Sequence, residues 1–402
     1  MSEPTPELFV DTVSAYQKTA AIKAAIGLGL FTAIGTDAKT IEAIAKETGA
    51  APKGIRILCD YLTVQGFLKK LGDRYEATAA TQTFLDAKSP TYMGGVVEFM
   101  ASPEMMRSFL EDPTSYVRNG GAIGSSTLDP NHPSWVTFAR AMVPFIAPLA
   151  QSAAEQVATW SPPPRKVLDI AAGHGMFGIA VGRVIPQAEI VAVDWEPVLT
   201  VAKENAEKAG IDNRYRTIAG SAFEVNFGSD YDLVLLPNFL HHFDKESCVE
   251  LLKKVKLSLS ATGKVLAVEF VPNEDRISPY MPACFAFIML AHTPSGDAYT
   301  GAELHAMAVE AGFKGATTVP LARSPESLVS FEREVKYGPT PKRLISQLLN
   351  FPQQIGCDSR TSPPGPDGGA RGQPRLSDER GPTETVGPVG WRSSRGGMKP
   401  RQ

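Results

Sequence analysis

Residues 165–195 read RKVLDIAAGHGMFGIAVGRVIPQAEIVAVDW, and this stretch decides the fold that the sequence predicts. Residues 167–170 are a short apolar run rich in β-branched side chains, which is typical of a buried strand. Two glycines then allow a sharp turn, and residues 176–185 carry apolar side chains at helical spacing. A second buried strand follows at 190–193. This order predicts a βαβ unit of an open α/β sheet, whose ligands bind beyond the carboxyl ends of the strands.

The choice of ligand depends on two carboxylates. The turn GHGMFG at 173–178 matches the G-x-G-x-x-G pattern of dinucleotide folds, and Asp194 lies near the distance expected for a ribose-binding acid. Asp169 precedes the glycines, where its charge would repel a pyrophosphate but suits a ligand with an ammonium and a sulfonium group. S-adenosylmethionine has both groups and a ribose. In the alternative interpretation, Asp169 is a helix-capping residue and Asp194 an ordinary strand-end acid.

With these features the sequence resembles the class I S-adenosylmethionine-dependent methyltransferases. It is most similar to the O-methyltransferases of the plant caffeate and hydroxyindole type and their bacterial natural-product relatives, over about residues 10–335. Ala171 stands where the glycine loop of the family commonly opens with Gly, and Ser221 where the family commonly has an acid in contact with adenine. The resemblance implies an α/β fold, in which a Rossmann-like sheet follows a mostly α-helical winged-helix dimerisation domain. The residues that we expect at the S-adenosylmethionine cofactor are Asp169, Gly173, Gly175, Asp194, Trp195, Ser221, Ala222, Phe223 and Asn238.

Two adjacent histidines, His241 and His242, follow the apolar strand that begins at Tyr231. Methyl transfer needs an acceptor oxygen that has lost its proton, and imidazole titrates near neutral pH. His241 corresponds to the catalytic histidine that opens the H-D-W-S-D-E segment of the plant-type enzymes, here HHFDKE. The resemblance implies that His241 is the general base and that Glu269 orients it. Alternatively, either histidine is a loop residue bonded to the main chain, or a metal ligand; we expect no metal site, because no H-x-x-x-H pair exists.

The second glutamate of the family falls at Ala298 and is missing, while the adjacent Asp297 would point elsewhere. A second hypothesis therefore stays open, in which the enzyme works mainly by holding the acceptor and the methyl donor in line. The residues that we expect to contact the acceptor, a small molecule with a hydroxyl on an aromatic or polyketide-like framework, are Phe138, Met142, His242, Phe285 and Met289.

Four segments are predicted along the chain. Residues 1–90 form the winged-helix domain, with helices at 8–34, at 40–48 and from Pro52, then a hairpin of 68–71 and 75–77. Residues 91–160 form a helical linker rich in methionine and aromatic side chains, interrupted by a loop at 120–133. Residues 161–335 form the catalytic domain, which ends in an antiparallel hairpin, and residues 336–402 form a disordered tail.

Two functions from other classes remain as alternatives: a nicotinamide-dependent oxidoreductase and a winged-helix DNA-binding regulator. The predicted wing carries Lys69, Lys70 and Arg74 beside two acidic residues, which is too mixed for a strong phosphate footprint. The resemblance implies instead that this domain forms a homodimer.

The composition bounds the partners and the compartment. A formal net charge of -3 over 402 residues gives no electrostatic case for nucleic acid or an anionic membrane. The four cysteines are scattered, the N-terminus is acidic and polar, and no apolar run approaches a membrane span. These features predict a cytoplasmic protein with reduced thiols.

Overall fold

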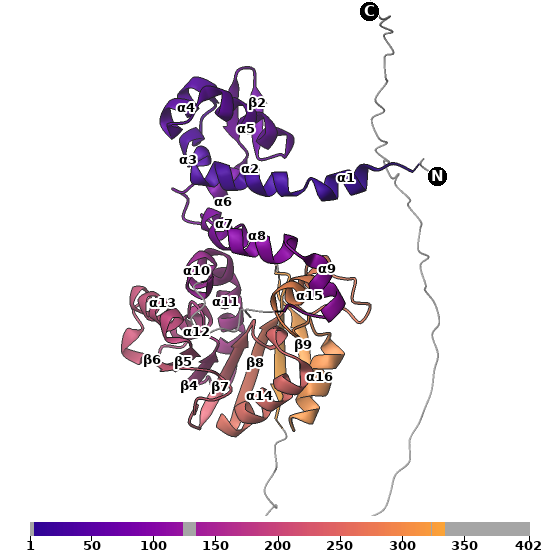
Figure 1. The fold of residues 1–402 in the computed structure, drawn as a ribbon. Helices are drawn as coiled ribbons and strands as arrows, with labels where there is room; N and C mark the ends of the chain where they lie inside the picture. The colour runs from indigo at the N-terminus through magenta and orange to yellow at the C-terminus, as the bar shows by residue number, and fades with distance from the viewer. Residues whose placement is uncertain (1–3, 124–133, 323, 334–402) are drawn as a thin grey trace, which may run out of the picture. The chain divides into compact units, whose positions relative to one another are not determined.

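The computed structural model describes residues 4–123, 134–322 and 324–333 (Figure 1). The tail expected at 336–402 and most of the loop expected at 120–133 lie outside the described residues.

The N-terminal region begins with three helices in place of the single helix expected at 8–34. They are α1 (Glu7–Val13), α2 (Tyr16–Gly27) and α3 (Leu30–Ile34). Gly29 adopts a φ of 62°, a left-handed conformation that a continuous right-handed helix excludes. The apolar periodicity of this stretch therefore identified the helical conformation but not the break.

The next elements follow the predicted order of two helices and a hairpin. The side chain of Thr40 caps α4 (Ile41–Thr48), Gly49 ends it with a φ of 68°, and Pro52 opens α5 (Pro52–Val64). The hairpin strands β2 (Leu68–Leu71) and β3 (Arg74–Ala77) are joined by β1 (Lys39–Thr40) in a sheet of order β1-β3-β2. A buried cluster that includes Leu30, Ile44, Ile55, Leu62 and Tyr75 packs these elements together.

The last helix of the N-terminal segment expected at 1–90 is α6 (Ala79–Leu85). The stretch expected as a helical linker at 91–160 is mostly helical in its described residues. Its elements are the 3₁₀ turn η1 (Gly94–Val96), α7 (Val97–Met100), α8 (Pro103–Leu110), α9 (Pro113–Asn119), α10 (Ser134–Ala141) and α11 (Val143–Ala158).

The catalytic region contains a seven-stranded sheet of order β6-β5-β4-β7-β8-β10-β9. The strands are β4 (Lys166–Ile170), β5 (Glu189–Asp194), β6 (Tyr215–Ala219), β7 (Tyr231–Pro237), β8 (Leu259–Glu269), β9 (Gly315–Pro320) and β10 (Ser327–Glu332). The strands from β6 to β8 pair in parallel, and β10 pairs antiparallel with both β8 and β9. This topology confirms the predicted α/β class and the closing hairpin.

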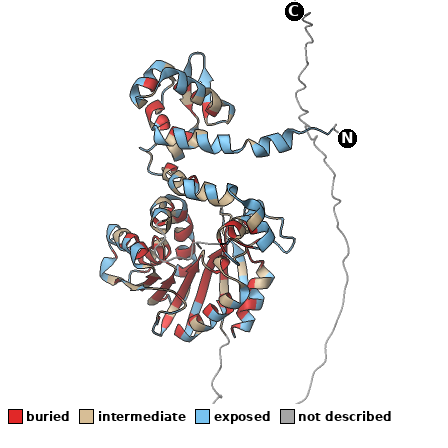
Figure 2. Ribbon diagram, viewed as in Figure 1, coloured by how far each residue is buried: buried red, intermediate tan, exposed pale blue. Residues whose placement is uncertain are grey.

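Helices cover both faces of this sheet, and Figure 2 shows its strands as the most buried layer. These helices are α12 (Met176–Val184), α13 (Glu196–Lys208), α14 (Lys245–Ser258), α15 (Tyr280–His292) and α16 (Gly301–Glu310). Successive residues of β4 enter different cores: Val167 packs in the cluster that includes α11–α13, and Leu168 in the cluster that includes α14 and α16. This alternation follows from the two-residue period of a strand and explains why β4 carries apolar side chains on both faces, with Asp169 as the one charged residue of 167–170.

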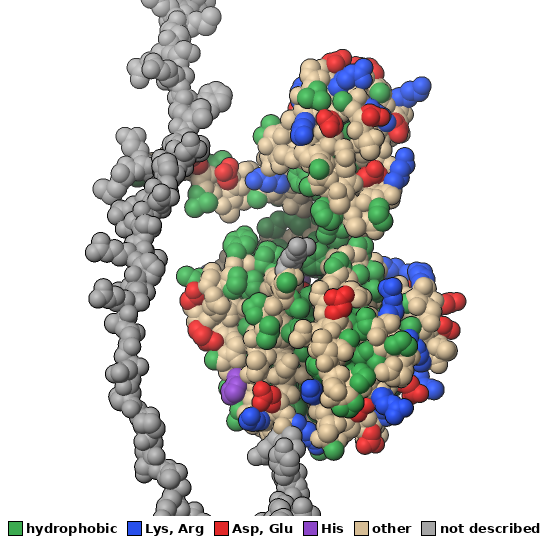
Figure 3. Space-filling model, turned by 180° about the vertical axis from the view of Figure 1, so that it is seen from behind, with side chains coloured by type: hydrophobic (Ala, Val, Ile, Leu, Met, Phe, Trp, Pro, Cys, Tyr) green, Lys and Arg blue, Asp and Glu red, His purple; other side chains and the backbone are tan. Residues whose placement is uncertain are grey.

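Within the part of the chain that the structure describes, no helix combines the length and the apolar character needed to cross a membrane. On the face drawn in Figure 3, acidic and basic side chains are interspersed over the N-terminal region. Lys70, for example, pairs with Asp60 at 2.6 Å, and Arg56 pairs with the same carboxylate at 3.1 Å. This mixed surface agrees with the charge pattern expected for the wing.

Candidate active site

The glycine turn between β4 and α12 has the backbone that the sequence predicts. Gly173 and Gly175 adopt φ values of 57° and 76°. A Cβ atom at Gly175 would lie 2.6 Å from the hydroxyl oxygen of Tyr215, so a side chain at this position would collide with a buried ring. Ala171 also adopts a positive φ, of 55°, which gives a physical reason why the family commonly has glycine there.

Asp169 has no exposed surface, and one of its oxygens accepts a hydrogen bond from the Gly178 N–H at 2.9 Å. This bond holds the first turn of α12 and corresponds to the capping alternative that the sequence left open. Burial raises the pKa of Asp169 to about 7, and the charge of Asp194 adds to the effect. Direct contact between Asp169 and a ligand stays a prediction.

Asp194 is the last residue of β5, and its side chain links the end of this strand to the glycine turn that follows β4. Its carboxylate accepts hydrogen bonds from the Gly173 N–H at 2.8 Å and from the Trp195 N–H at 2.7 Å. Burial raises its pKa to about 6, while both hydrogen bonds oppose the shift. Each carboxylate oxygen keeps a further lone pair, so the group can also accept from ribose hydroxyls. A turn with two glycines beside an accepting carboxylate fits S-adenosylmethionine.

The other residues expected at the cofactor lie at the carboxyl ends of neighbouring strands. Trp195 follows β5, while Ser221, Ala222 and Phe223 follow β6. The hydroxyl of Ser221 accepts from the Phe223 N–H at 3.2 Å, and the Phe223 ring packs edge-on against Phe243 at 4.9 Å. These contacts fix the loop, and the roles of its residues toward a cofactor stay predictions.

His241 and Glu269 form the most tightly connected pair at this edge of the sheet. His241 lies in the 3₁₀ turn η3 (Leu240–His242) after β7, and Glu269 is the last residue of β8. The His241 Nδ1 atom is 2.5 Å from Glu269 Oε2, and both side chains are buried. Glu269 Oε1 accepts from the N–H groups of Phe239 at 3.1 Å and Leu240 at 2.9 Å. A carboxylate that accepts at Nδ1 holds the proton there and leaves the His241 Nε2 atom as the basic site.

Aromatic side chains surround this imidazole. Phe285 of α15 packs edge-on against His241 at 4.7 Å and stacks on Phe270 at 4.0 Å. The His242 ring is 4.5 Å from His241 and 5.9 Å from Trp135. Phe285 and His242 were expected at the acceptor, whereas sequence reasoning missed Phe270, which only the stacking identifies.

Phe138, Met142 and Met289, the other residues expected at the acceptor, are embedded in packing. Phe138 packs against Trp135 at 6.0 Å and against His174 at 6.3 Å, while both methionines are buried. The contact between His174 and Phe138 was not expected, because the position of His174 in the glycine turn does not indicate which helix packs against it. Contact of any of these side chains with an acceptor stays a prediction.

His242 differs from its neighbour because its Nδ1 atom is buried and has no hydrogen-bond partner among the described residues. Burial lowers the pKa of His242 well below its usual range, and the nearby His241 and His292 add to the effect. The ring is therefore neutral at neutral pH.

Asp297 does not replace the missing second glutamate. Ala298 is fully buried, and the Asp297 carboxylate pairs with Arg276 at 3.3 Å, so it points elsewhere, as expected. A different acid, Glu326, lies near the carboxyl ends of the parallel strands, where it accepts from the Asn238 side-chain amide at 3.3 Å. Sequence reasoning missed Glu326, because the loop before β10 carries no motif.

Comparison with known proteins adds the family. The model of the O-methyltransferase domain matches residues 138–314, and that of the O-methyltransferase dimerisation domain matches residues 10–87. A candidate O-methyltransferase from Nostoc punctiforme, solved by crystallography, is 48% identical with a TM-score of 0.79 and covers 82% of this chain and 99% of its own. The chain belongs to the O-methyltransferase family.

Two further relatives of this O-methyltransferase are more distant. The 3-hydroxy-5-methyl-1-naphthoate 3-O-methyltransferase of Streptomyces sahachiroi is 29% identical, over 79% of this chain and 92% of its own. The human N-acetylserotonin methyltransferase, solved with S-adenosylmethionine, is 19% identical with a TM-score of 0.71, over 83% of this chain and 99% of its own. At that identity the likeness shows the fold alone.

Family membership makes this protein an S-adenosylmethionine-dependent methyltransferase. It favours neither of the two alternatives, the nicotinamide-dependent oxidoreductase and the DNA-binding regulator. The match of residues 10–87 also agrees with the dimerisation role expected for the N-terminal region.

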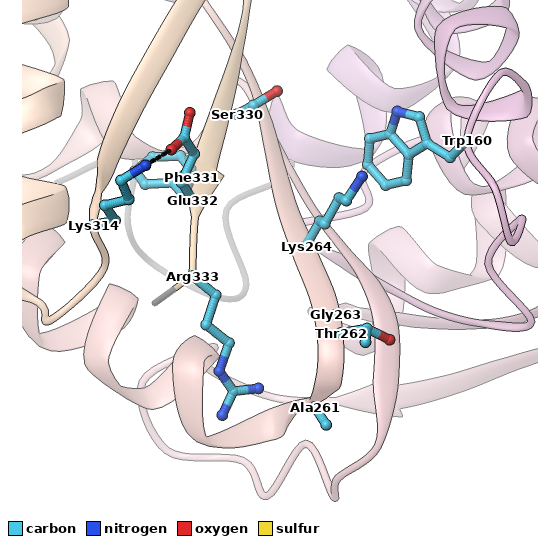
Figure 4. Close-up of a pocket in the computed structure, with 10 residues that line it drawn as sticks. All are labelled: Trp160, Ala261, Thr262, Gly263, Lys264, Lys314, Ser330, Phe331, Glu332 and Arg333. Carbon is cyan, nitrogen blue, oxygen red and sulfur yellow. Dashed lines mark ion pairs between the residues drawn. The ribbon is translucent and has the colours of Figure 1, made fainter. Parts of the chain in front are cut away.

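A separate hollow of about 640 Å³ lies near the amino end of β8 and the carboxyl end of β10 (Figure 4). The Lys264 ammonium group there lies 4.3 Å from the centre of the Trp160 ring, and Lys314 pairs with Glu332 at 3.4 Å. Ligands of open α/β sheets bind at the carboxyl ends of the parallel strands, so this hollow is at the wrong edge for the methyl-transfer site.

Proposed function

We propose that this enzyme methylates a hydroxyl group on a small aromatic or polyketide-like molecule, with His241 as the general base. The hydrogen bond of 2.5 Å between His241 and Glu269 carries the proposal, because it orients an imidazole whose second nitrogen is free to take a proton. The aromatic rings around His241 support an aromatic acceptor, since they offer flat apolar surface. The naming of the Streptomyces sahachiroi relative for a hydroxynaphthoate supports the same class.

The mechanism assigns one task to each part of the site. When bound, S-adenosylmethionine supplies the methyl group that passes from its sulfonium sulfur to the acceptor oxygen. Asp194 and the glycine turn hold the cofactor, together with the other residues expected beside them. The His241 Nε2 atom takes the hydroxyl proton, and Glu269 stabilises the imidazolium that forms. The half-buried rings of Phe270 and Phe285 displace water beside the buried His241–Glu269 pair, so the charge on this pair is weakly screened.

The first test is calorimetric titration with S-adenosylmethionine, S-adenosylhomocysteine and NAD, repeated on Asp194→Ala. We expect the two adenosyl ligands to bind and the variant to bind them more weakly. Hydroxynaphthoates and other phenols are then screened with methyl-labelled S-adenosylmethionine, using His241→Ala as the control. Binding of NAD alone would contradict the proposed cofactor, and labelling that His241→Ala retains would contradict the proposed base.

We also propose a cytoplasmic homodimer formed through the N-terminal region, with the four predicted segments as its domains. Leu8, Phe9 and Val13 of α1 are more than half exposed, and a second copy of the chain would cover them. Sedimentation equilibrium is expected to give twice the chain mass for the native protein and a lower mass for Val13→Asp. A monomeric native protein would contradict this arrangement.

A further inference from the structure

Glu326 is a buried carboxyl group to which the mechanism above gives no task. Only 2% of its surface is exposed, and it lies in the loop before β10. Ser327 pairs with Glu269 across β10 and β8, so Glu326 lies just beyond the end of β8. Its backbone N–H donates to the Ser324 hydroxyl at 3.1 Å, and its backbone carbonyl accepts from the Leu321 N–H at 3.0 Å. The position of Glu326 is therefore fixed by its own loop.

The side chain of Glu326 reaches the loop that carries the base. Its Oε2 atom accepts from the Asn238 amide, and Asn238 is the first residue after β7. The Asn238 N–H also donates to the Val268 carbonyl at 2.8 Å. Asn238 adopts a φ of 53°, a left-handed conformation that costs free energy in any residue with a Cβ atom. Such a residue keeps this conformation only where its surroundings hold it.

Consecutive residues of this loop are held by two glutamates. Asn238 is held by Glu326, and the next three residues, Phe239 to His241, all donate to Glu269. Glu269 ends β8 and Glu326 directly precedes the neighbouring strand β10, so the two acids together hold the whole of this short segment. The position at which the resemblance implies a second glutamate is occupied by Ala298, whose methyl group cannot accept a hydrogen bond.

We propose that Glu326 is a positioning residue that acts through Asn238 to hold the His241 loop, in place of the missing second glutamate. The proposal rests on the proposed role of His241 as base. Burial raises the pKa of Glu326 to about 8, and the charge of Glu269 adds to the effect, so the group is mostly neutral at neutral pH. A neutral carboxyl group still accepts from Asn238 through its carbonyl oxygen and adds no second charge beside Glu269.

The test follows the His241 Nδ1 proton in the full-length protein by NMR, with ¹⁵N-labelled histidine. The resonance is assigned by its loss in His241→Gln. We expect Glu326→Ala to shift or broaden it, whereas Glu326→Gln, which keeps an accepting oxygen, leaves it in place. Glu332→Ala is the matched control, because Glu332 lies at the other end of the same strand and is exposed. Binding of S-adenosylhomocysteine is expected to stay within about twofold of the native value in Glu326→Gln and Glu332→Ala, since both variants keep an oxygen at position 326 that accepts from Asn238.

Activity gives a second readout once an acceptor is found. We expect Glu326→Ala to lower kcat about tenfold or more, with the KM of the acceptor within about twofold, because misplacing a base affects the chemical step. Glu326→Gln is expected to restore most of the rate. An unchanged His241 resonance and kcat in Glu326→Ala would overturn the proposal, and so would a Gln variant as damaged as the Ala variant.

Two further arms keep the test decisive. If Glu326→Ala does not fold, Asn238→Ala removes the same hydrogen bond from the other side and is expected to shift the His241 resonance in the same way; an unchanged resonance there would overturn the proposal. If the native enzyme methylates no acceptor, the proposed function fails, but the His241 resonance still decides the role of Glu326.

Discussion

On both the cofactor side and the acceptor side of the site, a carboxylate at the end of a strand accepts hydrogen bonds from backbone N–H groups, but the two carboxylates have different roles. On the cofactor side, Asp194 accepts from the N–H groups of Gly173 and Trp195. On the acceptor side, Glu269 accepts from the N–H groups of Phe239 and Leu240. In both places a carboxylate at a strand end fixes the loop beside it. Only Glu269 also contacts an imidazole, so only the acceptor side combines loop fixation with acid–base chemistry.

The two sides also differ in how they are assembled. On the cofactor side, the glycine turn and Asp194 come from one continuous stretch, residues 165–195, while the other expected cofactor residues follow β6 and β7. The acceptor side brings together residues from separate segments, namely His241 after β7, Glu269 at the end of β8, Phe285 on α15 and Glu326 before β10. The comparison teaches that the glycine turn and its carboxylate are a local property of the chain, whereas the reacting half of the site depends on the order of the strands.

The largest expected effect is on the acceptor side. We expect His241→Ala to lower kcat by about 10²–10⁴-fold, because the variant loses its proton acceptor. The affinity for S-adenosylmethionine, measured by calorimetry, is expected to stay within about twofold. His305→Ala is the matched control, since His305 is exposed on α16. A nearly native kcat in His241→Ala would instead support the hypothesis that the enzyme works mainly by positioning.

The second effect tests the cofactor side through its backbone. We expect Gly175→Ala to lower the free energy of unfolding by roughly 2–4 kcal/mol, because left-handed strain adds to a collision with the Tyr215 hydroxyl. Gly210→Ala is the control: Gly210 has a similar φ of 68° but open space around it, so only about 1 kcal/mol of strain is expected. Urea unfolding of both variants measures the difference. An equal loss of unfolding free energy in the two variants would mean that the close approach to Tyr215 does not add to the destabilisation.

The third effect tests whether Asp194 is the counterpart of Glu269. We expect Asp194→Ala to weaken S-adenosylmethionine binding about 10–100-fold, because two loop N–H groups lose their acceptor together with the predicted ribose contact. Isothermal calorimetry measures the change, with Glu196→Ala, exposed in the first turn of α13, as the control. A variant that binds like the native enzyme would leave Asp194 as an ordinary strand-end acid.

The smallest effect concerns the pH dependence of stability on the acceptor side. The pKa of Glu326 is raised from 4.5 to about 8 in the folded protein, so between these values the folded state keeps a proton that the unfolded state has lost. The contribution of Glu326 to stability is therefore fully present below pH 4.5 and is lost as the pH rises toward 8. Glu326→Gln does not titrate, so we expect its free energy of unfolding relative to the native protein to be roughly 1 kcal/mol more favourable at pH 6 than at pH 5.

Urea unfolding of both proteins at the two pH values measures this difference, and the other titrating groups cancel in the comparison. A difference that does not change with pH would show that Glu326 has the same pKa in the folded and unfolded states. That result would contradict the buried, neutral carboxyl group inferred above.

The sequence by itself determined the α/β class and the glycine turn, and its resemblance to the methyltransferase family implied the histidine–glutamate pair. The class and the turn depend on local signals, namely the largely apolar strand at 167–170 and the glycines at 173 and 175. Only the tertiary structure decided that Asp169 holds the Gly178 N–H, that Asp297 turns away to Arg276, and that Glu326 reaches Asn238. The physical reason is that β10 lies between β8 and β9, which brings the loop before β10 to the carboxyl end of the parallel strands. The position of Glu326 beside Asn238 depends on this strand order, and the residues around Glu326 in the sequence do not reveal the order of the strands.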